Sequence, residues 1–359
     1  MSALINRIAG TGLFALDVLV RLDGSVANPS LGGSAGNVLS ILGALGWTAV
    51  PIGTTGDDSA ATLLNDAFDA LGADLSFFKR SKHQCTPIIY QHQQGADAED
   101  THRFSFTCPV CGERRRPVWG DEQAILKAQE RLPAASVFFL DRPTKLGVAL
   151  AQRYASQGTL VIFEPSSLGD DPDLFRSALH AAHIVKYADE RLDDLPYEKA
   201  ARPLVEIQTR GADGLRFRVR SLDNAWLTLG AYALPYVRDT SGAGDWCTAG
   251  LIFELFRLGG LPKMADHSAL VRALVFGQAL SSLNCLTEGA RGLLAAWSPQ
   301  KILKAAGELR GRRLQSLMTD KLHPEQRVNE PRLALLAGDK NLGKLKDVAH
   351  DEAVCCVEH

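Results

Sequence analysis

Short apolar runs alternate with longer amphipathic segments through most of the chain, and this alternation limits the possible folds more than any other feature. The apolar runs are brief, rich in β-branched or aromatic residues and bounded by Gly, Pro or polar residues, as buried strands are. We expect strands at 48–53, 136–140, 159–164, 183–187 and 203–208. We expect helices at 35–46, 58–71, 121–131, 144–157 and 172–181. This order predicts an α/β fold, with a mostly parallel sheet covered by helices on both faces.

Two segments depart from the alternation. Residues 74–107 contain strand-like pieces joined by polar connections, which indicates a small β lid over approximately 74–118. From residue 242 onward the pattern is mostly helical, with helices expected at 243–259, 263–285 and 299–313. We therefore expect one domain over 1–320, lid included. Residues 321–359 lose clear periodicity and are expected to be a partly mobile C-terminal extension, with a docked helix at 332–337 as the alternative.

Composition and charge exclude several classes of protein. With 359 residues, of which 46% are hydrophobic and 22% charged, the chain resembles an average globular protein. A net charge of −2 gives no electrostatic reason to expect nucleic acid or a membrane surface as partner. We see no signal peptide and no run of about 18 apolar residues. Seven scattered cysteines argue against a disulfide framework. We expect a cytoplasmic protein.

The stretch "DTSGAGDWCTAG", residues 239–250, combines a glycine turn with the start of an apolar helix. Small residues at Gly242, Ala243 and Gly244 leave backbone N–H groups accessible, and the helix dipole adds partial positive charge, which makes an anion site. Asp245 follows directly. One interpretation is a helix cap that contributes about 1 kcal/mol. The other is phosphoryl transfer, in which the turn holds the transferring group and Asp245 takes the proton of the attacking alcohol.

"DTSGAGD" resembles the C-terminal signature of the ribokinase-like (PfkB) family of sugar and nucleoside kinases. Residues 32–74 are similar to the N-terminal signature, with paired glycines, an Asn, a Leu-Gly, a strand and then "GTTGDD". The resemblance covers about residues 5–310. It implies a three-layer ribokinase-like sandwich with a central mostly parallel sheet and a small β lid. It also implies ATP-dependent phosphorylation of a hydroxymethyl group on a sugar or nucleoside, with Mg²⁺ bridging the phosphates, Asp245 as base and residues 242–244 as anion hole.

The resemblance also assigns the substrate site. In such kinases the first strand ends with an Asp that binds sugar hydroxyls, and Asp17 matches it. An Asp in an apolar strand is costly to bury without a polar partner, which independently suggests a ligand. Relatives often have an Asn where Ala15 stands. The substrate residues implied by the resemblance are Asp17, Gly32, Gly33, Asn37 and Asp141.

Two further sets of residues follow from the resemblance. The ATP-binding residues that it implies are Lys186, Thr209, Gly211, Gly214 and Gln278. The residues that fall on a monovalent-cation site found in many members are Asp239, Ser241, Asn284, Thr287 and Gly289. A potassium ion there would draw carbonyl oxygens together and stiffen the anion hole.

One departure from the family affects the metal. Relatives often carry "N-x-x-E" after a strand, where it organises magnesium and phosphates, but here Ala188 and Arg191 take those two positions. Asp189 or Glu190 could substitute through water, and Lys186 could meet a phosphate directly. The departure supports an alternative function, a catalytically weak relative that binds a ligand as a regulatory or assembly subunit.

Cys108 and Cys111 have the spacing of a zinc knuckle within the lid. Two thiolates leave a tetrahedral shell incomplete, so the other ligands must come from His83, Cys85, His92 or His102, or from a second protomer. Because the β lid is the usual dimer contact in ribokinase-like proteins, we expect a homodimer through the lid, in which two knuckles could share one zinc ion. The alternative is a pair of ordinary thiols in a turn.

Overall fold

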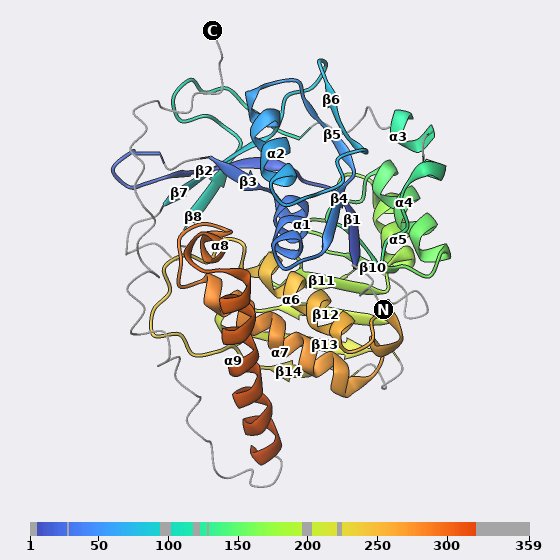
Figure 1. Cartoon of the computed structure of the whole chain (residues 1–359), viewed down its shortest axis with the longest axis vertical. Coiled ribbons are helices and arrows are strands. Elements are labelled where there is room, and N and C mark those ends of the chain that lie inside the picture. Colours follow the sequence, from blue (N-terminus) through green and yellow to red (C-terminus); the bar gives the residue numbers. More distant parts are fainter. Residues whose placement is uncertain are drawn as a thin grey trace. The chain divides into compact units, whose positions relative to one another are not determined.

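The computed structural model describes residues 6–26, 29–93, 102–117, 123–127, 129–195, 203–220 and 225–320. These residues form two units (Figure 1). Unit 1 contains the described residues up to Glu164 and residues 169–181, and unit 2 contains residues 165–168 and the described residues from Ala182 onward. The extension expected at 321–359 lies outside the described residues.

Unit 1 is built on four parallel strands. Their order is β10 (Leu160–Phe163), β9 (Val137–Leu140), β1 (Arg7–Thr11) and β4 (Thr48–Pro51). Figure 1 shows α1 (Ser34–Ala44) on one side of these strands, and α4 (Lys145–Ser156) and α5 (Pro172–Ala181) on the other. Strands covered on both faces need continuous apolar sequence, and all four residues of β9 and of β10 are buried.

A second sheet of unit 1 corresponds to the expected lid. Its order is β3 (Ser30–Gly32), β2 (Ala15–Val20), β7 (Ile88–Gln93) and β8 (His102–Ser105). A separate pair joins β5 (Gly53–Gly56) to β6 (Phe78–Ser81). The strands expected within 74–107 are confirmed, but two strands of the lid sheet come from before residue 74. Asp17 therefore lies in the middle of the second strand, not at the end of the first, because the chain leaves β1 at Thr11 and begins a new strand at Ala15.

Asp58 connects helix α2 (Ser59–Asp69) to the segments around the lid. As the N-cap of α2, it accepts a hydrogen bond from Ala61 N at 2.9 Å. The same carboxylate accepts from Thr86 Oγ1 at 2.6 Å and from Thr86 N at 3.0 Å, and Arg115 Nη2 lies 3.3 Å away. Burial alone raises the pKa of Asp58, but the hydrogen bonds from Thr86 and Ala61 and the charge of Arg115 outweigh it and hold the pKa below its usual value.

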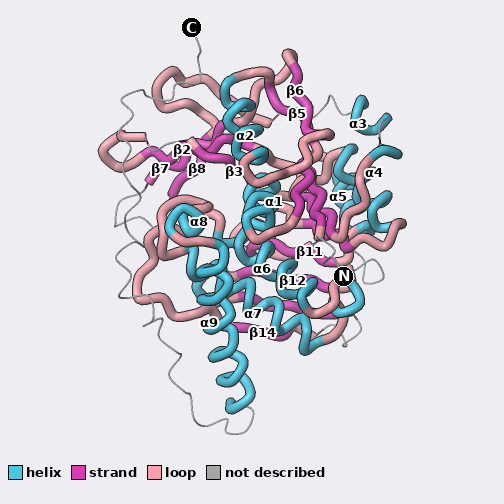
Figure 2. The backbone as a smooth tube through the Cα atoms, in the orientation of Figure 1, coloured by secondary structure: helices cyan, strands magenta, loops and turns pink. Residues whose placement is uncertain are grey.

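Unit 2 has four strands and four α-helices among its described residues. Strand β11 (Ile184–Ala188) pairs in parallel with β12 (Val205–Thr209), and β13 (Leu215–Val219) and β14 (Leu227–Leu229) continue antiparallel. The helices are α6 (Ala243–Arg257), α7 (His267–Asn284), α8 (Gly292–Ala296) and α9 (Pro299–Asp320), shown in cyan in Figure 2. No described helix is both long and apolar enough to cross a bilayer.

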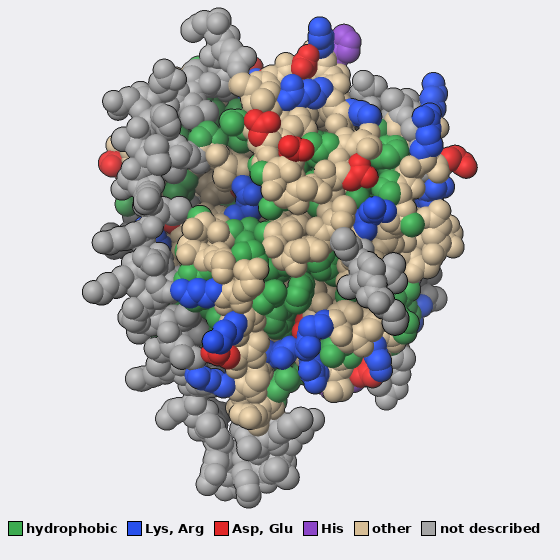
Figure 3. Space-filling view, in the orientation of Figure 1, with side chains coloured by type: hydrophobic (Ala, Val, Ile, Leu, Met, Phe, Trp, Pro, Cys, Tyr) green, Lys and Arg blue, Asp and Glu red, His purple; other side chains and the backbone are tan. Residues whose placement is uncertain are grey.

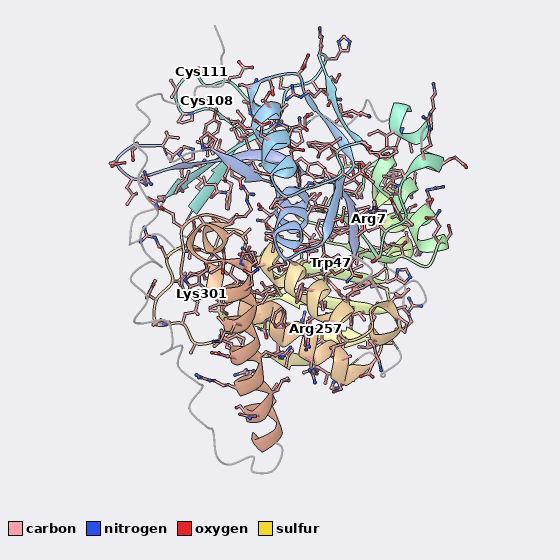
Figure 4. All side chains as sticks on the ribbon, in the orientation of Figure 1. Arg7, Trp47, Cys108, Cys111, Arg257 and Lys301 are labelled. Carbon is pink, nitrogen blue, oxygen red and sulfur yellow. The ribbon has the colours of Figure 1, made fainter. Side chains whose placement is uncertain are left out.

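A buried carboxylate joins three of these helices. Glu254 of α6 is fully buried and accepts hydrogen bonds from Arg257 Nε at 2.6 Å and Arg257 Nη2 at 2.9 Å. Arg310 of α9 donates to the same carboxylate, and Arg272 of α7 lies 3.9 Å from it. Arg257 and Lys301 are labelled in Figure 4, and Figure 3 shows basic side chains on the surface over α9. Buried charge is tolerated where it is paired in this way.

Most element types agree with the expectations, and most of the differences are at the ends of elements. Helix α5 matches the expected 172–181. Helix α7 begins at His267 and not at 263, because residues 261–263 form a 3-10 turn and Asp266 caps the helix by accepting from Ala269 N. Helix α9 continues to Asp320, beyond the expected 313, and α8 was not expected.

Candidate active site

Asp17 lies in a polar position within the lid sheet. Its side chain is 8% exposed, and Oδ2 accepts a hydrogen bond from Gln91 Nε2 at 3.1 Å. Gly32, on the neighbouring strand β3, lies directly against it: a Cβ at position 32 would fall 1.9 Å from the Asp17 carboxyl carbon. A side chain at position 32 would have to displace the Asp17 carboxylate, so the absence of a Cβ at Gly32 leaves that carboxylate its place.

Gly33 and Asn37 adjoin the same place through the start of α1. Gly33 is the N-cap of α1 with φ of 76°, and a Cβ there would lie 2.3 Å from Leu13 O. Asn37 N donates to Gly33 O at 2.8 Å, and the Asn37 side chain is 4% exposed. The structure therefore brings four of the five expected substrate residues together.

Asp141, the fifth, has a different environment from the one expected. Its side chain is fully buried; Oδ1 accepts from Leu13 N at 3.0 Å and Oδ2 accepts from Ala35 N at 3.1 Å. A Cβ on Gly12 would fall 1.8 Å from Oδ1, so a glycine is required there. Burial raises the pKa of Asp141, with Arg142 and the two backbone N–H groups opposing. The carboxylate thus binds the backbone N–H groups of Leu13 and Ala35, beside Gly33. The sequence suggested instead that it would face the sugar.

The glycine turn of unit 2 depends on close packing. Gly242 has the left-handed φ of 72° and is the N-cap of α6, and a Cβ there would lie 2.7 Å from Ala290 Cα. Trp246 is fully buried, and its Nε1 donates to Ala290 O at 2.9 Å. The first turn of a helix presents N–H groups that lack an intrahelical acceptor, and this makes it suited to an anion. Here Ala243 N already donates to Thr240 O at 3.1 Å, so an anion would bind chiefly the other N–H groups of the turn.

Asp245 occupies the first turn of α6 and is 9% exposed. The N-cap is Gly242, without a side-chain capping bond, so Asp245 is not the capping residue.

Two of the residues expected to bind ATP meet at the end of β14. Gly214 has φ of 91°, and a Cβ there would lie 2.2 Å from Leu229 O. Gln278 Nε2 donates to Leu229 O at 3.3 Å and to Gly230 O at 3.1 Å. Thr209 ends β12 and donates through Oγ1 to Tyr187 O at 3.4 Å, and Gly211 begins the 3-10 turn Gly211–Asp213.

The stretch that departs from the family is held by ion pairs. Asp189 Oδ2 lies 3.7 Å from Arg210 Nε, and Glu190 Oε1 lies 3.9 Å from Arg191 Nε. Both carboxylates therefore have an arginine beside them. Lys186 is 1% exposed within β11, opposite Ile207, whereas a direct phosphate contact requires an accessible ammonium group.

The residues expected to hold a monovalent cation lie together. Asp239 Oδ1 accepts from Ser241 N at 2.7 Å, and Oδ2 accepts from Gly289 N at 2.6 Å. Asn284 Nδ2 donates to Ser241 O at 3.0 Å and to Gly289 O at 3.4 Å, and Thr287 Oγ1 donates to Asn284 O at 2.8 Å. Apart from the buried Ser241 Oγ, for which no hydrogen bond is found, the oxygens named here already accept hydrogen bonds from the protein.

The cysteine pair forms a tight turn in the lid (Figure 4). Cys108 is buried and Cys111 exposed; Cys108 N donates to Glu113 O at 2.8 Å, and Gly112 N donates to Cys108 O at 3.0 Å. Among the described residues, no group of three or more His, Cys, Asp or Glu side chains could hold a metal ion. The His102 side chain lies outside the described set. A local zinc site completed by His83, Cys85 or His92 is therefore not found.

Sequence reasoning missed Gln91. It is 4% exposed in strand β7, whose residues Ile88 and Tyr90 are also buried. A polar side chain buried in an apolar strand was the available signal, because burial without a partner is costly.

Comparison with known proteins shows the family. The family model described as "pfkB family carbohydrate kinase" matches residues 23–296. The chain belongs to the pfkB family of carbohydrate kinases. It is 25% identical to fructokinase from Escherichia coli over 77% of this chain and 92% of that protein. It is 26% identical to aminoimidazole riboside kinase from Salmonella typhimurium over 72% of this chain and 83% of that protein.

Solved structures of pfkB-like kinases share the fold. The crystal structure of fructokinase from Xylella fastidiosa with bound ATP superposes with a TM-score of 0.66 at 19% identity, covering 84% of this chain and 98% of that one. The expected ribokinase-like α/β fold, with a central mostly parallel sheet and helices, is confirmed.

Proposed function

We propose that this pfkB-family protein is an ATP-dependent phosphotransferase that phosphorylates a hydroxymethyl group of a sugar or nucleoside. The observation that carries the proposal is the placement of Asp245 in the first turn of α6, after a left-handed glycine N-cap. A carboxylate beside an anion site is repelled by the anion, so the arrangement is useful where the carboxylate accepts a proton during the reaction.

In the proposed reaction, Asp245 takes the proton of the acceptor hydroxyl. The hydroxyl oxygen then forms a bond to the γ-phosphorus of ATP, the bond from that phosphorus to the β–γ bridging oxygen breaks, and ADP leaves. The turn of Gly242, Ala243 and Gly244 stabilises the charge on the transferring group. Gly214 and Gln278, which meet at the end of β14, are proposed to lie along the nucleotide.

Magnesium, when bound to ATP, neutralises charge on the phosphates. The residues that replace the family's "N-x-x-E" give limited support for a protein ligand, because Ala188 has no donor oxygen in its side chain and Asp189 and Glu190 lie beside arginines. We therefore propose that the metal arrives with the nucleotide and assign no step to it.

The acceptor is proposed to bind at Asp17, Gly32, Gly33 and Asn37. A carboxylate and an amide suit the neighbouring hydroxyls of a sugar, since the carboxylate accepts two hydrogen bonds and the amide both donates and accepts. The names of the relatives, fructokinase and aminoimidazole riboside kinase, support a sugar or a riboside as acceptor. Asp141 is proposed to position this segment.

The homodimer is proposed to form through the lid. Phe104 of β8 and Val110 of the cysteine turn are 51% and 59% exposed, and they are the apolar side chains that such a contact would cover. Light scattering on the purified chain tests this: a mass of two chains supports the proposal, and a monomer with unchanged turnover rejects it.

The function is tested by measuring ADP release with a panel of acceptors that includes fructose, ribose, aminoimidazole riboside and common nucleosides. We expect at least one acceptor to raise ADP release about 100-fold over hydrolysis without acceptor, which is a modest catalytic effect. Calorimetric binding of an acceptor without any turnover would instead support the alternative of a catalytically weak, ligand-binding subunit.

A further inference from the structure

Asn284 ends helix α7 with its side chain fully buried between two backbone carbonyls. Nδ2 donates to Ser241 O at 3.0 Å and to Gly289 O at 3.4 Å, and Oδ1 accepts from Leu293 N at 3.3 Å. This network determines the orientation of the amide, because turning it over would direct Oδ1 at two carbonyl oxygens and Nδ2 at an N–H group. The –NH₂ group therefore lies between the carbonyls.

Most of the surrounding oxygens accept hydrogen bonds as well, Ser241 Oγ being the exception. Both carboxylate oxygens of Asp239 accept backbone N–H groups, from Ser241 and from Gly289. Asn284 O accepts from Thr287 Oγ1. A monovalent cation needs several oxygens aimed at one point, and here an –NH₂ group with partial positive charge already occupies the point between two of them. The set of residues does not fit a bound potassium ion.

The bridged carbonyls belong to the two segments that form the glycine turn. Ser241 directly precedes Gly242, and Gly289 directly precedes Ala290. A Cβ on Gly242 would lie 2.7 Å from Ala290 Cα, and Trp246 Nε1 donates to Ala290 O. Drawing Ser241 O and Gly289 O toward one group therefore holds the turn in register with residues 289–290. A bound potassium ion was expected to have this same effect, drawing the carbonyl oxygens together.

We infer that the amide of Asn284 replaces the monovalent cation in this chain, so that the anion hole is held rigid without potassium. Asn284 is a positioning residue, because it acts through the backbone of the turn. The activity arm of the test rests on the proposed function. The measurement of Tm detects cation binding whatever the reaction is. Failure of this inference can therefore be distinguished from failure of the proposed function.

The first experiment compares potassium, sodium and tetramethylammonium chlorides at equal ionic strength, on the full chain. Turnover of the wild-type protein should agree within about twofold, and Tm should not rise with potassium, because a ligand that binds only the folded state raises Tm by mass action. A loss of turnover of about tenfold or more in tetramethylammonium, or a rise in Tm with potassium, would overturn the inference.

The second experiment removes the amide in Asn284→Ala. In tetramethylammonium we expect turnover to fall about 10- to 100-fold, as a small misplacement of a catalytic group does. Potassium should then restore turnover and raise Tm, because the two carbonyls and the buried Ser241 Oγ become available to a cation. A variant with wild-type turnover, or one that potassium does not rescue, contradicts the inference.

Two further variants serve as a control and as a substitute for Asn284→Ala. Asn65→Ala is the matched control, since Asn65 Nδ2 also donates to a backbone carbonyl, Ala61 O at 2.9 Å, in helix α2 of unit 1. It should leave the cation response unchanged. If Asn284→Ala does not fold, Asn284→Asp keeps the shape and replaces the donor by an anionic oxygen. The Asp variant should become potassium-dependent in Tm, and an Asp variant indifferent to potassium overturns the inference.

Discussion

Gln91 Nε2 donates a hydrogen bond to Asp17 Oδ2 at 3.1 Å, from strand β7 to its parallel neighbour β2. The register explains the contact: Gln91 lies opposite Leu19, and Asp17 shares a sheet face with Leu19 because alternate residues of a strand point the same way. The amide therefore fixes the direction of the Asp17 carboxylate, to which we propose that the acceptor binds.

Gln91→Ala should raise the KM for the acceptor about tenfold while the KM for ATP stays the same. Removing the donor leaves the buried Asp17 carboxylate without this hydrogen bond, which costs about 1–3 kcal/mol and lets the carboxylate move from its position. Steady-state kinetics with each substrate varied in turn measures this. Gln93→Ala, in the same strand, is the control and should have little effect. Equal shifts in both KM values would remove Gln91 from the acceptor site.

Asp245→Asn should lower kcat about 10²–10⁴-fold, the range for losing a general base, with the fold and ATP affinity retained. The amide has nearly the same shape but cannot take the proton. Asp266→Asn, at the start of α7, is the control because Asp266 caps a helix without a proposed catalytic role. Turnover near that of the wild type in Asp245→Asn would exclude Asp245 from the mechanism.

Asp141→Asn should lower the free energy of unfolding by about 2 kcal/mol. The amide has one oxygen and one –NH₂ group, so one of the two buried backbone N–H groups loses its acceptor and faces a donor. Since those groups belong to Leu13 and Ala35, beside the acceptor segment, the KM for the acceptor should also rise. Urea titration and kinetics together check this. An unchanged stability would contradict the bracing role.

Asp58→Asn should change how stability depends on pH. The folded pKa of Asp58 lies below its unfolded value of 3.8, so the ionised carboxylate stabilises the fold above that pH and the stabilisation is lost as pH falls through the folded pKa. The variant should be about 1 kcal/mol less stable at neutral pH, because Asn keeps the N-cap but loses the charge that pairs with Arg115 and strengthens the hydrogen bond from Thr86. It should also lose less stability on acidification. Parallel acid profiles for both proteins would contradict this.

Cys108 and Cys111 remain predicted zinc ligands, and because no local cluster of three ligands is found among the described residues, the shared form is the one that we test. We expect about one zinc per two chains, because two thiolates from each protomer complete a tetrahedral shell. Metal analysis of protein purified without added zinc measures it, and Cys108→Ser should lose both metal and dimer. Absence of zinc, with both thiols reactive in the folded protein, leaves an ordinary turn.

The sequence by itself determined the features that depend on local or periodic patterns. Alternating apolar and amphipathic segments specified the strands and helices, because burial of one face repeats at the period of each element. The turn at 242–244 and its Asp245 were evident from a local pattern as well. A left-handed N-cap and an open first turn require glycine at a fixed spacing from the helix.

Only the tertiary structure decided which polar groups meet. Asp141 binds Leu13 and Ala35, which are 128 and 106 residues away, Gln91 reaches Asp17 across 74 residues, and Asn284 reaches Ser241 across 43. The motif placed Asp141 at a sugar and Asn284 beside an ion. Whether a buried polar side chain faces a ligand or a backbone group depends on strand register and helix packing, which arise from contacts distant in sequence and leave no periodic trace in it.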